Sequence, residues 1–182
     1  MDTRKLLVIS DIHGNINKLK QVFSWAQDSK LYDTAIRDVV FLGDGINDLY
    51  KAANAAGYYC NLNKVRGNND YGAEIPETAI FNIEKHHFFI CHGHRYALYS
   101  GYHTLINAAR YAGAGTVLFG HTHIPYMNSI NGITLINPGS IGNPRSRIGA
   151  SFAVIECMAG EPLKTNFFGI GAEIREITLP GN

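Results

Sequence analysis

This sequence of 182 residues has few cysteines, a net charge near zero and no long hydrophobic run. The three cysteines, Cys60, Cys91 and Cys157, form no Cys-x-x-Cys pair. This argues against a disulfide framework or a thiolate zinc site and suits a reducing compartment, so we interpret the three side chains as small buried hydrophobic groups. The formal net charge of +1 gives no general attraction to nucleic acid or to a membrane surface.

No apolar stretch approaches the length of a transmembrane helix, and the N-terminus leads into a strand pattern without the features of a signal peptide. We therefore expect a cytoplasmic protein with no membrane partner. The length predicts one domain over residues 1–182, which is long enough to bury a substantial core.

Short apolar runs that end in polar turns fill most of the chain. Strands are expected over residues 5–10, 38–42, 58–65, 78–83, 87–91, 116–119, 127–130, 133–136, 150–157, 163–170 and 173–179, and helices over about 15–26, 47–56 and 102–112. Asn131-Gly132 tolerates positive φ and predicts a type I′ hairpin turn. The α/β units come first and a β-rich tail follows, which predicts an α/β fold of two packed sheets flanked by helices. The tail also offers a strand edge, which leaves a homo-oligomer open.

Several predicted strands end in residues that can bind metal ions. The run 116–119 leads into Gly120-His121-Thr122-His123, and the first strand leads into Asp11-Ile12-His13. Open α/β sheets bind ligands at such strand ends, and neutral imidazole is a common ligand of divalent transition metals. The candidate ligands collected in this way are Asp11, His13, Asp44, Asn68, His92, His121 and His123.

Seven nitrogen or oxygen donors exceed what one tetrahedral ion needs, and they suit two ions that share a ligand. A carboxylate can bridge two metals where an imidazole cannot, so Asp44, between two glycines, is the natural bridging candidate. Two cations roughly 3.5 to 4 Å apart would acidify a bridging water or hydroxide and hold the oxygens of an in-line displacement at phosphorus. This predicts hydrolysis of a small phosphate ester.

The motifs that carry these residues also resemble those of a known family. They are Asp11-x-His13, Gly43-Asp44, Gly67-Asn68-x-Asp70, His92-Gly93-His94 and Gly120-His121-x-His123. Their order and rough spacing resemble those of the calcineurin-like metallophosphoesterases, and the chain is most similar to the small YfcE-type phosphodiesterase branch. The resemblance runs from Leu6 to about Arg147.

The resemblance implies a four-layer α/β/β/α sandwich of two mixed β-sheets flanked by helices. It also implies two divalent ions, with Mn²⁺ preferred, while a mixed nitrogen and oxygen site would equally accept Ni²⁺, Fe²⁺, Co²⁺ or Zn²⁺. By the same resemblance, the first metal is bound by Asp11, His13 and His123, the second by Asn68, His92 and His121, and both by Asp44.

One position departs from the family pattern. Many relatives have a histidine directly after the metal-binding asparagine, where it is thought to protonate the leaving alcohol, and this chain has Asn69. An amide cannot act as a general acid. We therefore expect a phosphodiesterase that favours leaving groups needing little protonation, with His94 either supplying a proton or holding a phosphate oxygen. The expected catalytic residues are Asp44, Asn68 and His94.

Two alternatives stand beside this interpretation. The first is a non-catalytic metal-binding scaffold of the same fold, like the retromer subunit of the VPS29 type. The second follows from Gly43-Asp44-Gly45-Ile46-Asn47-Asp48, which resembles the magnesium motif of haloacid-dehalogenase-type phosphatases. We regard the second as a coincidence, because the first strand ends in Asp11-Ile12-His13 and lacks the second carboxylate of that mechanism.

Other polar residues near the motifs have simpler interpretations. Asp70 either caps a turn or orients a ligating histidine, and we favour the second role. Asn137 and Ser140 are expected to be turn residues that wall the site. Arg145 and Arg147 are either surface charges or groups that attract the substrate phosphate. A structural or surface role is expected for His86, His87 and His103.

Overall fold

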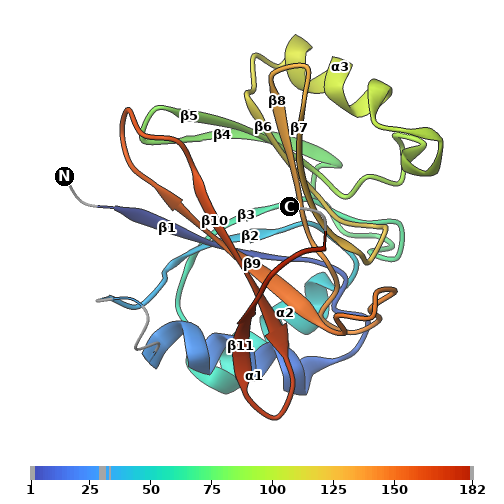
Figure 1. Cartoon of the computed structure of the whole chain (residues 1–182). Helices are drawn as coiled ribbons and strands as arrows, with labels where there is room; N and C mark the ends of the chain where they lie inside the picture. The colour runs from blue at the N-terminus through green and yellow to red at the C-terminus, as the bar shows by residue number, and fades with distance from the viewer. Residues whose placement is uncertain (1–2, 29–31, 33, 181–182) are drawn as a thin grey trace.

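The structure is a computed structural model that describes residues 3–28, 32 and 34–180 (Figure 1). The strands of the first sheet are β1 (Arg4–Ile9), β2 (Asp38–Phe41), β3 (Asn61–Lys64), β9 (Ser151–Cys157), β10 (Lys164–Ile170) and β11 (Ile174–Ile177). Those of the second are β4 (Thr78–Ile83), β5 (His86–Cys91), β6 (Thr116–Phe119), β7 (Pro125–Ile130) and β8 (Ile133–Pro138). The helices are α1 (Ile16–Asp28), α2 (Ile46–Ala56), α3 (His103–Tyr111) and a short 3-10 helix, η1 (Leu98–Ser100).

Both sheets are mixed. The six-stranded sheet has the order β11-β10-β9-β1-β2-β3, in which β1, β2 and β3 pair in parallel and the other neighbours are antiparallel. The five-stranded sheet has the order β4-β5-β6-β8-β7, in which β5, β6 and β8 are parallel. Each sheet therefore has a parallel set of strands whose carboxyl ends lie at one edge.

The hydrophobic residues separate into three layers of core. Helices α1 and α2 pack on the outer face of the six-stranded sheet, where Leu19, Val22 and Phe23 of the predicted helical stripe are fully buried. A second cluster, with Val8 and Ile90, lies between the two sheets, and a third joins α3 to the five-stranded sheet. Figure 1 shows α1 and α2 on one side of the molecule and α3 on the other. The predicted four-layer α/β/β/α sandwich is thus confirmed.

The strand at residues 58–65 is shorter than expected, because β3 comprises only Asn61–Lys64 at the sheet edge. The C-terminal hairpin is present, with its first strand, β9, almost wholly buried between β1 and β10. The strand expected over residues 173–179 is β11, which lies at the edge of the six-stranded sheet. The predicted type I′ turn is also present, since Asn131 and Gly132 have φ values of 52° and 81°.

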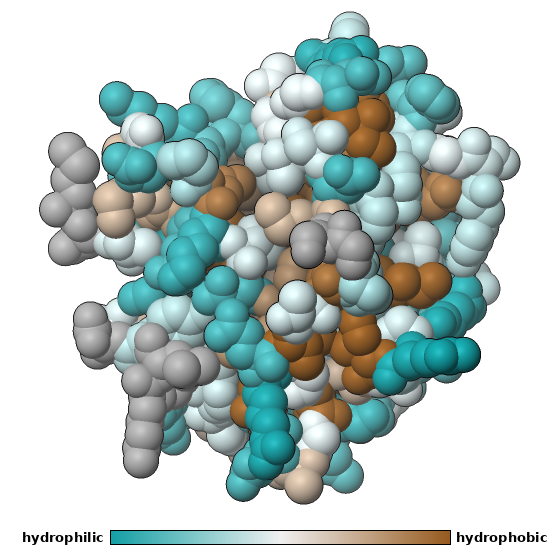
Figure 2. All heavy atoms as spheres, viewed as in Figure 1, coloured by the Kyte–Doolittle hydropathy of each residue, from teal (hydrophilic) through white to brown (hydrophobic). Residues whose placement is uncertain are grey.

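In the described part of the chain, no helix is both long and apolar enough to cross a membrane. Figure 2 shows a mostly hydrophilic surface on the face viewed in Figure 1, with hydrophobic residues gathered near its centre. The prediction of a single domain over residues 1–182 stays a prediction.

Candidate metal centre

The loops that follow β1, β2, β5 and β6 bring most of the predicted ligands together. Backbone hydrogen bonds continue beyond the strand ends and hold these loops side by side. Asp11 N donates to Gly43 O (3.0 Å), Ile12 N to Asp44 O (2.8 Å), and Gly120 N to His92 O (2.9 Å). The parallel pairing of the strands therefore places their polar ends at one site.

A first group of possible metal ligands consists of Asp11, His13 and His123. Nε2 of His123 lies 3.0 Å from Asp11 Oδ1, and Nε2 of His13 lies 3.7 Å from the same oxygen. The two imidazole Nε2 atoms are 3.3 Å apart. Three donor atoms from the loops after β1 and β6 therefore face one point.

A second group consists of Asp11, Asp44 and His92. Nε2 of His92 lies 3.5 Å from Asp44 Oδ2 and 3.9 Å from Asp11 Oδ1, and it is 3.3 Å from Nδ1 of His121. Asp44 Oδ2 is also 3.6 Å from Nε2 of His13, so it lies between the two groups. Asp11 belongs to both groups, and the site thus contains two carboxylates in the place where the sequence predicts one shared ligand, Asp44.

The backbone of these loops is strained at the candidate ligands. Five candidate ligands have positive φ values, between 42° and 67°, which residues other than glycine rarely adopt: Asp11, His13, Asp44, His121 and His123. Such conformations cost free energy and persist only where the surrounding structure holds them, and they cluster at functional sites. Five of the eight non-glycine residues with positive φ in the described part of the chain lie in these loops, and this clustering is typical of a functional site.

Hydrogen bonds behind the imidazoles fix which ring nitrogen faces the site. His92 Nδ1 donates to Leu42 O at 2.7 Å, and His123 Nδ1 donates to Asn143 O. Because a carbonyl oxygen only accepts, Nδ1 carries a proton in each ring, and Nε2 is the nitrogen that faces the carboxylates. This is the arrangement that metal-binding histidines usually have.

Asn69 and Asp70 both hold Asp44 in place. Asn69 donates its backbone N–H to Asp44 Oδ1 at 2.8 Å and its side-chain Nδ2–H to Asp44 Oδ2 at 2.6 Å. Asp70 is buried and accepts from the backbone N–H groups of Asp44, Gly45, Ile46 and Gly67, at 2.8–2.9 Å. The preferred expectation that Asp70 orients a histidine is wrong, because its carboxylate fixes the backbone of the Asp44 turn instead.

The backbone of Gly67 lies very close to this turn. A Cβ at position 67 would be 2.6 Å from Asp44 N and would also collide with the Asp44 carboxylate. Glycine is therefore required there for Asp44 to reach its position.

The surroundings favour a deprotonated Asp11, and they shift the pKa values of His121 and His13 in opposite directions. Burial alone would raise the pKa of Asp11, but its contacts with His123, His13 and His92 outweigh burial and leave this pKa well below the usual value. Burial and the proximity of His92 lower the pKa of His121. The pKa of His13 is raised, mainly by its interaction with Asp11.

The donor set fits divalent metal ions. Asp11 Oδ1 is a buried carboxylate oxygen that accepts no hydrogen bond from the described residues. A buried carboxylate normally has such partners or binds a cation. Its other oxygen accepts from Ser10 Oγ and from His121 N, so Oδ1 alone is directed at the imidazoles. Carboxylate and imidazole together suit Mn²⁺, Fe²⁺, Co²⁺, Ni²⁺ and Zn²⁺.

The remaining predicted residues lie around this cluster. Asn68 is exposed in the turn beside Asn69, and its role as a ligand stays a prediction. The His94 ring is 5.5 Å from the His92 ring and 6.3 Å from the His121 ring, and its Nδ1 is buried without a hydrogen-bond partner among the described residues. Burial and the nearby His92 lower the pKa of His94.

Asn137 and Ser140 are fully buried, so they brace the site rather than form its wall. Asn137 Nδ2 donates to Gly120 O at 2.8 Å, and Ser140 Oγ donates to Asp11 O at 2.8 Å. Asp48, the last residue of the haloacid-dehalogenase-like motif, lies outside both groups and accepts from the backbone N–H of Gly14 at 2.9 Å.

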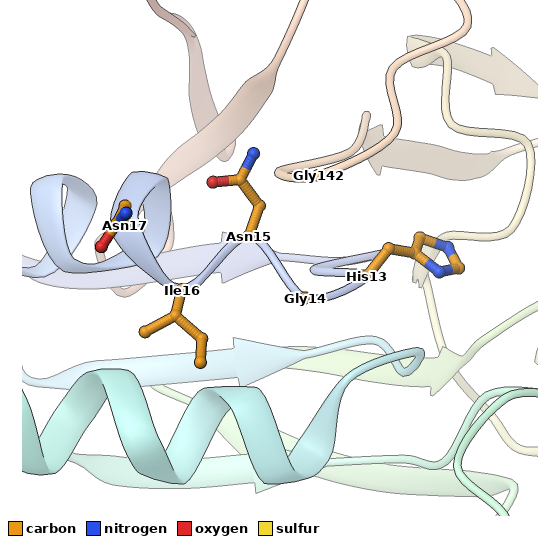
Figure 3. A pocket seen from close by; sticks show the side chains of 6 residues that line it. All are labelled: His13, Gly14, Asn15, Ile16, Asn17 and Gly142. Carbon is orange, nitrogen blue, oxygen red and sulfur yellow. The ribbon is translucent and has the colours of Figure 1, made fainter.

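A cavity of about 480 Å³ opens beside the first group, lined by His13, Gly14, Asn15, Ile16, Asn17 and Gly142. Figure 3 shows the His13 imidazole extending away from helix α1, and Asn15 lying beside the Gly142 loop. The volume is in the range of small-molecule sites, so a small ester has room beside His13 of the first group.

Sequence reasoning missed Tyr99. Its ring centroid is 6.1 Å from that of His121, and its hydroxyl accepts a hydrogen bond from Arg145 Nη1 at 3.0 Å. Tyr99 lies outside every motif, and its only sequence signal is an aromatic residue a few positions after His92-Gly93-His94.

Residues 5–160 match the model of the calcineurin-like phosphoesterase superfamily domain. A probable metallophosphoesterase of Mycoplasma genitalium is 33% identical, with 79% of this chain and 80% of the relative covered. The phosphodiesterase YfcE of Escherichia coli K12 is 28% identical, with 84% and 87% covered. The crystal structure of Entamoeba histolytica Vps29 complexed with Zn²⁺ has a TM-score of 0.72 at 19% identity, with 95% of this chain and 97% of that chain covered.

Proposed function

Since the chain belongs to the calcineurin-like phosphoesterase superfamily, we propose that it is a metal-dependent phosphodiesterase with two divalent ions. The observation that carries the proposal is Asp11 Oδ1, a buried carboxylate oxygen without a hydrogen bond that faces the imidazoles of His123 and His92. The phosphodiesterase YfcE is a relative over most of the chain, which supports the choice of reaction.

In this proposal Asp11, His13 and His123 hold the first ion, Asn68, His92 and His121 hold the second, and Asp44 contacts both. When bound, the two ions would supply Lewis acidity and an activated water for in-line attack at phosphorus. Mn²⁺ is the proposed metal, and the donor set leaves room for its neighbours in the transition series.

The chain's own side chains orient these groups. Asn69 directs the Asp44 carboxylate through two hydrogen bonds, and backbone carbonyls fix the rings of His92 and His123. Asn68 offers a neutral amide oxygen, which limits the negative charge that an approaching phosphate meets. His94, beside the second group, either donates a proton to the leaving group or holds a phosphate oxygen.

Asn69 supports the preference for diesters with good leaving groups. Its amide is engaged with Asp44 and has no proton to transfer to a leaving alkoxide. An aryl leaving group needs little protonation, so aryl and activated diesters should react faster than alkyl monoesters.

The direct test is to remove the metal, reload the protein with each divalent ion, and assay bis-p-nitrophenyl phosphate and p-nitrophenyl phosphate. We expect Mn²⁺ to restore diesterase activity above monoesterase activity. Faster hydrolysis of the monoester would contradict our interpretation of Asn69. An H94A variant with an unchanged pH-rate profile on an alkyl ester would remove His94 as the acid.

A non-catalytic scaffold remains the second candidate, and the similarity in fold to Vps29 favours it. Metal content and turnover together separate the two functions. Protein that binds two ions but hydrolyses no ester in a broad panel would support the scaffold. Hydrolysis that disappears in the D44N variant would support the enzyme.

A further inference from the structure

An exposed tyrosine and an arginine lie next to each other at the edge of the candidate metal centre. Tyr99, in η1, is 69% exposed, although its ring is large and mostly apolar. The ring lies beside His121 at an interplanar angle of 60°, and its hydroxyl is bound by Arg145. The exposed face of Tyr99 is thus placed within reach of anything that binds at His121.

Both side chains are tied to histidines of the site through the backbone. Arg145 N donates to His123 O at 3.1 Å, in the same turn whose Asn143 carbonyl accepts from the His123 ring. Tyr99 follows Leu98, which is buried in the core beneath α3. The pair therefore joins the loop of the first group to the segment after the second group.

Arg145 has the properties of an anion-binding side chain. It is exposed, and in the part of the chain that the structure describes no carboxylate pairs with it. Arg66 and Arg95, by contrast, both pair with Glu77, at 2.8 and 3.0 Å. A planar guanidinium with unused donors matches the oxygens of a phosphate ester.

We propose that Tyr99 and Arg145 form a substrate-recognition pair, in which Arg145 binds a phosphate oxygen and Tyr99 stacks on a flat aromatic group of the ester. The inference rests on the proposed function and specifies its substrate class, a phosphodiester with an aromatic ester group. A tyrosine side chain has only two rotatable χ angles, so little conformational entropy is lost when a second ring stacks on it.

Binding can be measured without turnover by calorimetry, with Mn²⁺-loaded protein and two monoester probes. Phenyl phosphate and cyclohexyl phosphate have the same charged group and similar size, but only the first is flat and aromatic. We expect the wild-type protein to bind phenyl phosphate about fivefold more tightly. The Y99L variant should lose this preference, whereas Y99F, which keeps the ring, should retain it.

The matched controls are exposed residues of the same types on α3. Tyr111 is 98% exposed, and the Y111L variant should bind both probes as the wild type does. The R145A variant should weaken both probes equally, because it removes a phosphate contact and not the ring, whereas R110A should weaken neither. Equal affinity of wild-type protein for the two probes, or a preference that survives in Y99L, would overturn the proposal.

Hydrolysis of bis-p-nitrophenyl phosphate gives an independent measure. Loss of ring stacking in Y99L should raise KM about fivefold and leave kcat nearly unchanged. The KM of Y99F should stay close to that of the wild-type protein. A fall in kcat with constant KM in Y99L would contradict the proposed role. Protein that shows the Tyr99-dependent binding preference but hydrolyses no ester would retain the recognition pair and refute the phosphodiesterase function.

Discussion

At the scale of single residues, substitutions of the two carboxylates of the site are expected to change the metal content differently. Asp44 Oδ2 lies between His13 and His92, so a bridging Asp44 is needed by both ions. We expect D44N to lose both ions and all hydrolysis, and D11N to retain the second ion, because His92, His121 and Asp44 remain. The measurement is the metal-to-protein ratio after dialysis, by mass spectrometry.

The metal-to-protein ratio also shows which of the two carboxylates, Asp11 or Asp44, bridges the ions. If D11N lost both ions and D44N kept one, Asp11 would be the shared ligand, as its membership of both groups allows. Circular dichroism serves as the control, since either variant must be folded for its metal content to be interpreted.

Substitution of Asp70 is expected to change the stability of the fold. Its buried carboxylate accepts four backbone N–H groups, and D70A would leave these donors unsatisfied. We expect D70A to lower the free energy of unfolding of the metal-free protein by roughly 3 kcal/mol. E74A, in the same loop but exposed, is the matched control and should change the free energy little.

Urea denaturation of D70A and E74A measures both values. Equal stability of the two variants would mean that the N–H groups find other partners when Asp70 is removed.

The sequence identified the chemical type of the site residues better than their hydrogen bonds. His-x-His and Asp-x-His at strand ends predicted where donors gather, because that inference needs only the strand pattern and residue type. The contacts of Asn69 and Asp70 with the Asp44 turn join residues 25 or 26 positions apart. They depend on how the two loops are positioned relative to each other. No local sequence pattern encodes how two distant loops are placed relative to each other, so the sequence does not predict that Asp70 binds the backbone of the Asp44 turn.

At the scale of elements, the end of β6 depends on a glycine. A Cβ at Gly120 would lie 2.8 Å from Asp11 Oδ2 and would collide with Ser10 Oγ. We expect G120A to push the loops of β1 and β6 apart and to reduce metal affinity at least about tenfold. Gly115, at the other end of the strand, has nothing near its Cβ position, so G115A is the control. Titration with Mn²⁺ measures both, and equal affinities would show that the loops adapt.

The elements themselves were largely predictable. Buried strands such as β6 have continuous apolar runs, and the helical stripe of α1 faces the core as expected. The exact ends of β3 were not predictable, because only pairing with β2 decides where an edge strand stops. The positive φ values of Asp11 and His121 were also beyond the sequence, since the surrounding fold imposes them against local preference.

At the scale of the whole molecule, the candidate site joins the two sheets. Asp11, His13 and Asp44 follow strands of the six-stranded sheet, whereas His92, His121 and His123 follow strands of the five-stranded sheet. Apart from the site, the sheets meet mainly through an apolar core, which is not directional, together with contacts such as the hydrogen bond from Ser151 Oγ to Pro138 O. Bound ions should therefore add directional contacts between the sheets and stabilise the native state relative to the unfolded chain.

Thermal unfolding with and without metal tests this coupling. At a free Mn²⁺ concentration of about one hundred times Kd, a single bound ion stabilises the native state by about 2.7 kcal/mol. For a chain of this length the midpoint of thermal unfolding, Tm, should rise by about 5–10 °C. The rise should disappear with a chelator and in D44N. Because the ligands come from both sheets, hydrogen exchange should slow in the loops after β1 and β6 together, and slowing confined to one sheet would contradict a site shared between them.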